Sequence, residues 1–150
     1  MIVRFGGNRL DCKLEFERRT AMKEQQIKEN ITEKVKQIID FIANHEYSKL
    51  HTITKIDRLW CGDKKTQMEG IEIFAEWLEE QLKIWSEDEE KEFVIDPYNE
   101  KYFTIQHFEG NQAFAVFEPH SHNEKLDFWF EFHFLIDEND NIISEFNINI

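Results

Sequence analysis

Residues 126–136 alternate strictly between an apolar set and a second, mostly polar set. Successive side chains of an extended strand point to opposite faces, so this period of two predicts a long β-strand with one apolar face. That face carries Leu126, Phe128, Phe130, Phe132, Phe134 and Ile136. The opposite face carries Asp127, Trp129, Glu131, His133 and Leu135. An aromatic side chain buries about 150–250 Å², so the phenylalanine face requires a cover and should dominate the core.

Residues 101–108, 112–118 and 142–150 are further strand-like runs, separated by short polar turns. Short turns between alternating runs are typical of hairpins, so these runs and residues 126–136 predict an antiparallel meander. The core face is expected to continue through Phe103, Ile105, Phe114, Val116, Ile142, Phe146 and Ile148. Phe117 and Ala115 are then expected on the outer face, beside Trp129.

The part of the chain before the meander has helical patterns instead. Apolar residues at steps of three and four predict helices over residues 20–45 and 68–85. A further helix is predicted from Ser48 to a stop at Gly62. Residues 2–5 are predicted to form a short strand. These patterns predict one α+β domain, residues 1–150, in which N-terminal helices pack on a curved, mostly antiparallel C-terminal sheet.

Length and composition agree with a single folded domain. The chain has 150 residues and 41% hydrophobic residues, which is enough to bury a substantial core. No apolar run approaches the ~18 residues of a membrane span, and the N-terminus lacks an apolar signal core. The two cysteines, Cys12 and Cys61, have no metal or redox spacing. A cytoplasmic location is therefore expected.

Negative charge is concentrated after residue 68. Residues 69–100 carry 2 Lys/Arg against 12 Asp/Glu, and the whole chain has a net charge of −13. Such a surface repels phosphate backbones and anionic lipids, which argues against nucleic-acid and membrane partners. It favours a basic protein partner.

The pattern resembles the cystatin-like architecture of the nuclear-transport-factor-two-like superfamily. The resemblance rests on the helical residues 35–53 and on residues 128–150, FWFEFHFLIDENDNIISEFNINI. It implies helices on a cone-shaped sheet. Members include small-molecule isomerases, hydrolases, dimerising domains, transport adaptors and bacterial toxin-immunity proteins, so the fold alone does not select a function. The very acidic chain is most similar to the immunity branch.

Candidate catalytic and metal-binding residues are few. His120 and His122, with His133 further on, could ligate a metal, but an exposed polar turn is the simpler interpretation. Residues 137–141 begin like a calcium loop but lack its later glycine and glutamate, so a hairpin turn is expected. We expect no metal, no cofactor and no catalytic residues.

The predicted function is protein binding by an immunity protein that masks the active surface of a basic toxin, such as a nuclease. The predicted contact residues are Glu87, Asp88, Glu89, Glu90, Glu92, Trp129, Glu131 and His133. One alternative is a small-ligand binder or enzyme with a cavity between sheet and helices, using His107 or Tyr102 with Tyr47 nearby. Another is a homodimer formed through the outer face of the sheet.

Overall fold

The computed structural model describes residues 9–57, 60, 62 and 65–149, with the backbone alone described for residues 9–22 and 149. Its helices are α1 (Arg9–Ala43), the 3-10 helix η2 (Tyr47–Thr52), α3 (Gln67–Glu89) and the 3-10 helix η3 (Glu100–Tyr102). Its strands are β1 (Lys55–Ile56), β2 (Phe103–Glu109), β3 (Gln112–Phe117), β4 (His120–Ser121), β5 (Glu124–Lys125), β6 (Trp129–Ile136) and β7 (Ile142–Asn149). The strand predicted at residues 2–5 lies outside the described residues.

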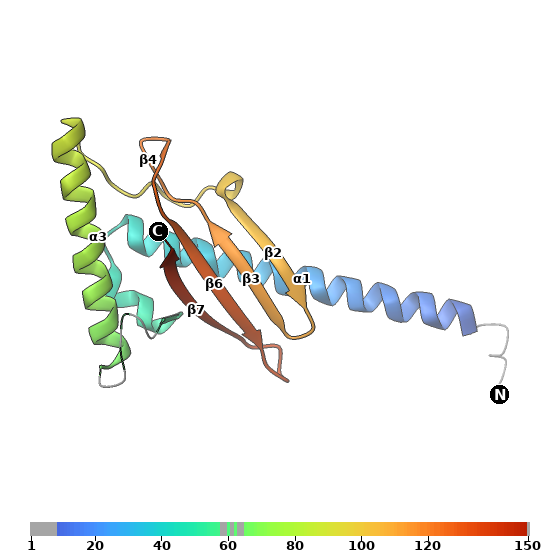
Figure 1. Ribbon diagram of the computed structural model, residues 1–150. Coiled ribbons are helices and arrows are strands. Elements are labelled where there is room, and N and C mark those ends of the chain that lie inside the picture. Colours follow the sequence, from blue (N-terminus) through green and yellow to red (C-terminus); the bar gives the residue numbers. More distant parts are fainter. Residues whose placement is uncertain (1–8, 58–59, 61, 63–64, 150) are drawn as a thin grey trace.

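The strands form a five-stranded sheet in the order β1-β7-β6-β3-β2. Strands β2, β3, β6 and β7 pair antiparallel, which confirms the predicted meander, and β1 pairs parallel to β7. A separate hairpin of β4 and β5 interrupts the connection between β3 and β6. Helices α1 and α3 pack against one face of the sheet (Figure 1), so the α+β architecture predicted from the sequence is confirmed.

Helix α1 covers the sheet with a single stripe. Among its described side chains, from residue 23 on, the buried apolar ones are Ile27, Ile31, Val35, Ile38, Ile39 and Ile42. This 3.6-residue periodicity is the one that predicts the helix, although α1 begins earlier than expected, at Arg9. The helix is followed by a left-handed residue, His45, with φ of 59°.

The helix predicted from Ser48 to Gly62 is wrong. The described residues form η2 and then the edge strand β1, where Lys55 lies opposite Glu145, and Trp60 is helical again, so no single helix spans this segment. Ser144 on β7 secures this arrangement, because its buried hydroxyl donates to Thr54 Oγ1 at 2.8 Å. Pairing with a strand about ninety residues away, and the β-branched residues near 54, outweigh local helical periodicity.

Helix α3 begins at a well-formed cap and extends further than predicted. The Thr66 hydroxyl accepts from the Glu69 backbone N–H at 3.2 Å. The helix does not end at Trp85 but continues to Glu89, and Glu90 follows with a left-handed φ of 53°. Part of the acidic run is therefore the last turn of a helix.

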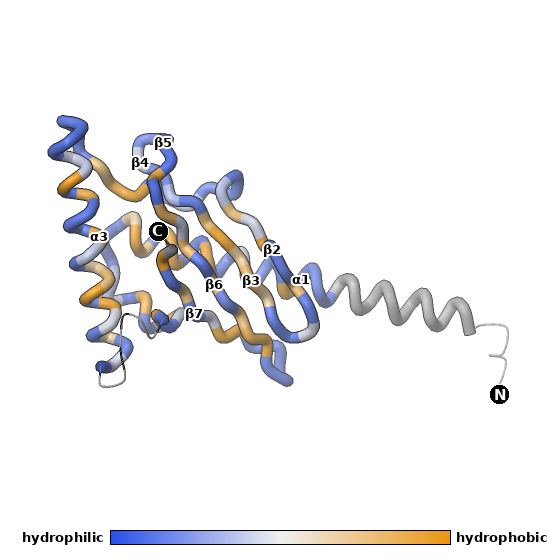
Figure 2. Tube along the Cα trace, in the orientation of Figure 1, coloured by the Kyte–Doolittle hydropathy of each residue, from blue (hydrophilic) through white to orange (hydrophobic). Residues whose placement is uncertain are grey.

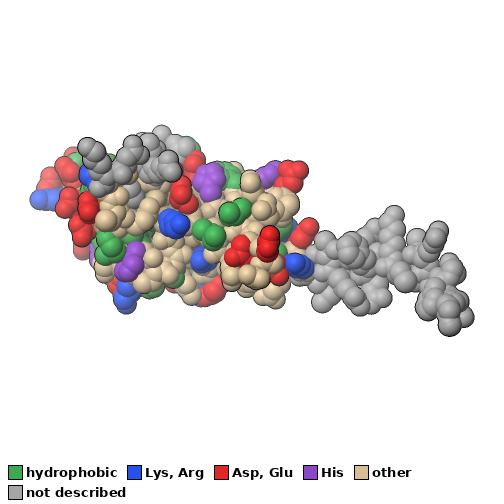
Figure 3. Space-filling model, turned by 90° about the horizontal axis from the view of Figure 1, so that it is seen from below, with side chains coloured by type: hydrophobic (Ala, Val, Ile, Leu, Met, Phe, Trp, Pro, Cys, Tyr) green, Lys and Arg blue, Asp and Glu red, His purple; other side chains and the backbone are tan. Residues whose placement is uncertain are grey.

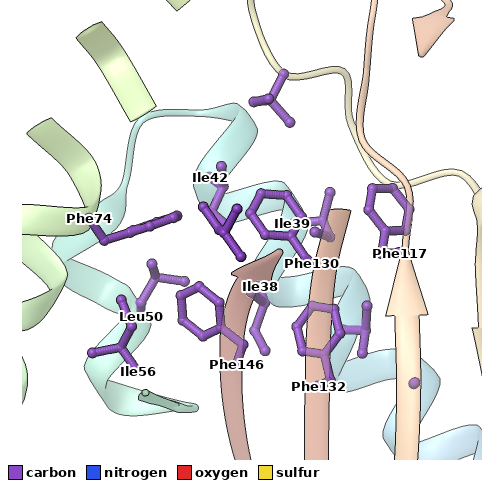
Figure 4. Packing of buried hydrophobic residues seen from close by; sticks show 14 of the residues in the cluster. Ile38, Ile39, Ile42, Leu50, Ile56, Phe74, Phe117, Phe130, Phe132 and Phe146 are labelled. Atoms are coloured by element: carbon purple, nitrogen blue, oxygen red, sulfur yellow. The ribbon is translucent and has the colours of Figure 1, made fainter. Parts of the chain in front are cut away.

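The phenylalanine face of β6 forms the core, as predicted. Phe130 and Phe132 are fully buried, and Phe74 of α3 lies 5.3 Å from Phe146 and 6.4 Å from Phe130 between ring centroids. Figure 4 shows isoleucines of α1, including Ile38, facing these rings across the core. Edge-to-face aromatic pairs of this kind add to the hydrophobic gain from burial.

The two faces of β3 are the reverse of the prediction. Phe117 pairs with Phe130 on the core face and is 1% exposed, and Ala115 is also buried. Phe114, which pairs with His133, is half-buried on the outer face, as is Val116. The run from 113 to 117 is entirely apolar, so its alternation does not distinguish the two faces.

The prediction that His107 could enter a cavity between sheet and helices is wrong, because β2 contains a bulge. The register shifts between Ile105 and His107, so that His107 lies opposite Phe114 on the outer face. Its side chain is 60% exposed and lies 3.3 Å from Glu109. His107 therefore does not enter a cavity between sheet and helices.

Candidate functional site

The predicted contact residues fall into two groups in the structure. The acidic group, Glu87–Glu92 without Lys91, lies exposed at the C-terminal end of α3 and just beyond it. The sheet group lies on the outer face of β6, where Trp129 and Glu131 are half-buried and His133 is exposed. Figure 2 shows that the hydrophilic end of α3 and the hydrophilic β4–β5 hairpin lie at the same end of the molecule.

The chain between β5 and β6 connects the two groups. Asp88 and Glu89 border a cleft of about 230 Å³ together with Lys125, Leu126 and Asp127. Those last three residues also border an adjoining cleft of about 240 Å³ that reaches Trp129. We call this connected region the acid–tryptophan surface. The name refers to six of its lining residues, Asp88, Glu89, Glu124, Asp127, Trp129 and Glu131, and the basic residue Lys125 also borders all three clefts.

Ion pairs neutralise part of the charge around this surface. Lys91 Nζ lies 3.0 Å from Glu124, and Lys125 Nζ lies 3.5 Å from Glu118. Within the described part of the chain, Asp88, Glu89 and Asp127 form no ion pair. Their negative charge is therefore the part that remains to attract a ligand or partner.

The acids at the end of α3 are unfavourable for the helix itself. A helix C-terminus carries a partial negative charge, which basic side chains stabilise and acidic ones destabilise. The last turn of α3 contains no basic residue but includes Glu87, Asp88 and Glu89. Figure 3 looks along α3 from its N-terminal end, and acidic side chains also gather over the helix in this view, at the left end of the molecule. Selection for helix stability does not explain this arrangement.

Trp129 lies where the acidic region meets the outer face of the sheet. Its indole N–H donates to Glu131 Oε1 at 3.0 Å. Both residues border a shallow cleft of about 380 Å³, which continues over Phe114 and Val116. A fixed, half-buried tryptophan beside open apolar surface is typical of an interface anchor.

His133 belongs to a different part of the outer face. It is four residues from Trp129 along β6, about 13 Å away at strand spacing. It lies beside a shallow cleft of about 330 Å³ near Leu135 and Ile143, which pair in register and are 42% and 45% exposed. The sequence analysis did not predict that Ile143 is exposed. Because Ile142 was expected on the core face, the alternation along the strand would have placed Ile143 on the outer face.

The candidate metal ligands do not converge. His133 is on β6, whereas His120 and His122 are on the β4–β5 hairpin. The described residues contain no group of three side chains that could hold a metal ion. The prediction of an exposed polar turn is correct for His122, which is exposed. It is wrong for His120, which is 7% exposed, and for Ser121, which is fully buried.

The carboxylate of Asp96 is one reason why His120 and Ser121 are buried. It accepts hydrogen bonds from the backbone N–H groups of His122 at 3.0 Å and Asn123 at 2.8 Å. The hairpin is thereby held against the segment after α3, and His120 is drawn into the fold.

The residues proposed for a sheet–helix cavity also lie apart. Tyr47 donates a short hydrogen bond to Glu79 on α3, and burial together with that carboxylate raises the pKa of the phenol. Tyr102 stacks on His120, and His107 is on the outer face of β2. These side chains do not form one catalytic group. At the turn after β6, Asp137 accepts from the backbone N–H groups of Asn139 and Asn141, as a hairpin turn requires.

No helix in the described part of the chain has an apolar stretch long enough to cross a bilayer. No protein-family model, curated protein or solved structure matches the chain.

Proposed function

We propose that the chain is a protein-binding module whose partner docks on the acid–tryptophan surface. The supporting observation is that Asp88 and Glu89, distant in sequence from Trp129, border a cleft that shares residues 125–127 with the adjoining cleft at Trp129. A binding surface needs both an anchor that excludes water and charges that orient the partner.

The partner that suits this surface is basic. The chain has a net charge of −13, and three acids of the surface have no ion pair within the part that the structure describes. Long-range attraction of a basic protein would accelerate association at low salt and weaken as salt screens it. The acids also lie where they weaken α3, a loss that a binding role would explain.

A toxin-immunity role is the specific form of this proposal. The order of elements, with N-terminal helices, a short parallel edge strand, a further helix and a C-terminal meander, supports the resemblance to the nuclear-transport-factor-two-like superfamily. In its immunity branch the partner would be a toxin in the same cytoplasm. Acidic side chains would occupy the groove where a nuclease receives phosphates, and Trp129 would anchor the contact.

The proposal is tested by capture followed by an activity assay. Tagged chain is incubated with lysate of the native host at low and at high salt, and the captured proteins are identified. The proposal expects a stoichiometric basic protein that is lost at high salt and whose activity, for instance nucleic-acid cleavage, stops at one equivalent of the chain. A partner that is acidic, or is held equally at both salts, contradicts it.

Homodimerisation is the second candidate, and one observation favours it. Leu135 and Ile143 lie opposite each other and expose large apolar side chains on the outer face. Sedimentation equilibrium of wild type and Leu135→Lys decides this candidate. A concentration-dependent dimer that the substitution abolishes supports it, and a monomer in both samples eliminates it.

A further inference from the structure

A further cleft lies on the other side of the β4–β5 hairpin from the acidic end of α3 (Figure 1). It has a volume of about 250 Å³ and lies where the hairpin meets the segment from Asp96 to Tyr102. That segment is fixed to α1, because the backbone N–H of Tyr98 donates to Asp40 Oδ1 at 3.0 Å. None of the residues of the acid–tryptophan surface borders it, so it is a separate site.

His120 contributes a hydrogen-bond acceptor to this cleft. The residue borders the cleft and is only 7% exposed. Its Nδ1 lies 2.8 Å from the backbone carbonyl oxygen of Glu118. A carbonyl oxygen can only accept, so Nδ1 carries the proton and, in the neutral ring, Nε2 is left as an acceptor. This hydrogen bond therefore leaves Nε2 as the nitrogen with which the His120 ring could accept from a ligand in the cleft.

Aromatic rings form the walls. Tyr102 stacks on His120 with ring centroids 3.5 Å apart and an interplanar angle of 17°. Tyr98 stacks on Phe117 at 5.6 Å and 21°. The hydroxyl of Tyr98 is buried and has no hydrogen-bond partner. Every other fully buried side-chain N or O atom in the described part of the chain has one. These stacks occupy one face of each tyrosine ring, so a cation would bind at the opposite face; tyrosine faces are electron-rich and attract cations.

Asp96 supplies the fixed charge. It borders the cleft, and none of the described residues that line the cleft is a lysine or an arginine. Its carboxylate is oriented by the backbone N–H groups of His122 and Asn123, at 3.0 and 2.8 Å. An ionised carboxylate has about four acceptor sites, so two bonds leave capacity for a ligand.

Together these features match a flat cation that donates several hydrogen bonds. A guanidinium group is planar, carries five N–H donors and stacks on aromatic faces, whereas an ammonium is compact and more strongly hydrated. We propose that this cleft binds a guanidinium group, as carried by arginine. Free arginine and an arginine side chain of a protein present the same chemistry, and the experiment separates them.

The test follows backbone amide signals of the ¹⁵N-labelled full chain during titration. The probes are N-acetyl-L-arginine N-methylamide, the corresponding citrulline compound and free L-arginine. Citrulline is the matched control, since its urea group has nearly the shape of guanidinium without the charge. The proposal expects saturable shifts at Asp96, Tyr102 and Asn123, with citrulline at least threefold weaker.

Substitutions of Tyr102 test whether its aromatic ring contributes to binding of the arginine compound. Tyr102→Leu should weaken the arginine compound roughly three- to tenfold, the range expected for loss of a cation–π contact, and Tyr102→Phe should retain binding. Tyr47→Leu, at a half-buried tyrosine away from the cleft, should leave binding unchanged. If Tyr102→Leu fails to fold, the comparison of arginine with citrulline on wild type decides the question.

The outcomes are distinct. Equal binding of citrulline, shifts without saturation, or shifts centred on Asp88 and Glu89 would overturn the proposal. Tighter binding of free arginine than of the blocked compound identifies a free small molecule as the source. Equal or tighter binding of the blocked compound identifies a protein side chain. A failure here leaves the proposed partner surface untouched, because the two sites share no residue.

Discussion

The two faces of the sheet differ in what covers them. On the inner face, Phe130, Phe132 and Phe146 pack beneath α1 and α3 and are fully buried. On the outer face no described helix covers the strands, and Leu135 and Ile143 remain exposed between charged and polar residues. The inner face contributes mainly to folding, and the outer face is free to contact other molecules. Changes on the inner face should therefore alter stability much more than changes on the outer face.

The largest effect is expected on the inner face. Phe132→Ala should lower the free energy of unfolding by about 3–5 kcal/mol, because it leaves a cavity in a close-packed core. Phe114→Ala, a half-buried phenylalanine on the outer face, should lower it by less than half as much. Urea unfolding followed by circular dichroism measures both. Equal losses would show that the two faces do not differ in this way.

A smaller effect of opposite sign is expected at the end of α3. The double variant Asp88→Asn, Glu89→Gln should raise the free energy of unfolding by about 0.5–1 kcal/mol at low salt, because it removes acids from a helix C-terminus. Glu69→Gln is the control in the first turn of α3 and should lower it. In urea unfolding, the gain should shrink near 1 M salt. A loss of stability in the double variant would mean that these acids stabilise the helix.

On the outer face, Leu135→Thr should change the free energy of unfolding by no more than about 0.5 kcal/mol, as expected for a surface substitution. Phe134→Ala, the neighbouring core position, is the matched comparison, because that residue is only 3% exposed. Thermal and urea unfolding of the pair provide the measurement. A large loss for Leu135→Thr would place that side chain in a core contact.

The smallest effect is expected at Asp137. The backbone N–H of Asn141, assisted by that of Asn139, lowers the pKa of this carboxyl group. Its folded pKa is below its unfolded value, so it stabilises the protein above the unfolded pKa, about 3.9, and this contribution disappears as pH falls through the folded pKa. Urea unfolding of wild type and Asp137→Asn across acidic pH should show a difference at neutral pH that vanishes in that window. A difference that grows on acidification would reverse the assigned sign.

Local patterns predicted the elements whose alternation is unambiguous. The strand β6 has strictly alternating phenylalanines, and α1 has one apolar stripe, so the type of both elements was predicted correctly, although β6 begins at Trp129 instead of residue 126 and α1 begins at Arg9. The faces of β3 were not, since residues 113–117 are all apolar and only pairing with β6 determines which side is buried. The strand β1 was mistaken for helix because its stability comes from β7, far away in sequence.

The candidate surface could be predicted in parts but not as a whole. The acidic run and Trp129 are conspicuous in the sequence, but their connection is not. It depends on the β4–β5 hairpin, which Asp96 fixes through backbone hydrogen bonds, and on the extension of α3 to Glu89. The cleft beside His120 has the same origin. Long-range hydrogen bonds of this kind leave no periodic signal in a sequence.

The most direct test of the proposed binding surface is a comparison of capture by four forms of the chain from the same native-host lysate at low salt. They are wild type, Trp129→Ala, the double variant Asp88→Lys, Glu89→Lys, and the control Glu72→Lys, Glu76→Lys, which makes the same charge change elsewhere on α3. We expect wild type and the control to retain the same basic protein, whereas the other two forms should capture at least tenfold less of it. Equal retention by all four, or equal loss in both double variants, would contradict a partner site at the acid–tryptophan surface.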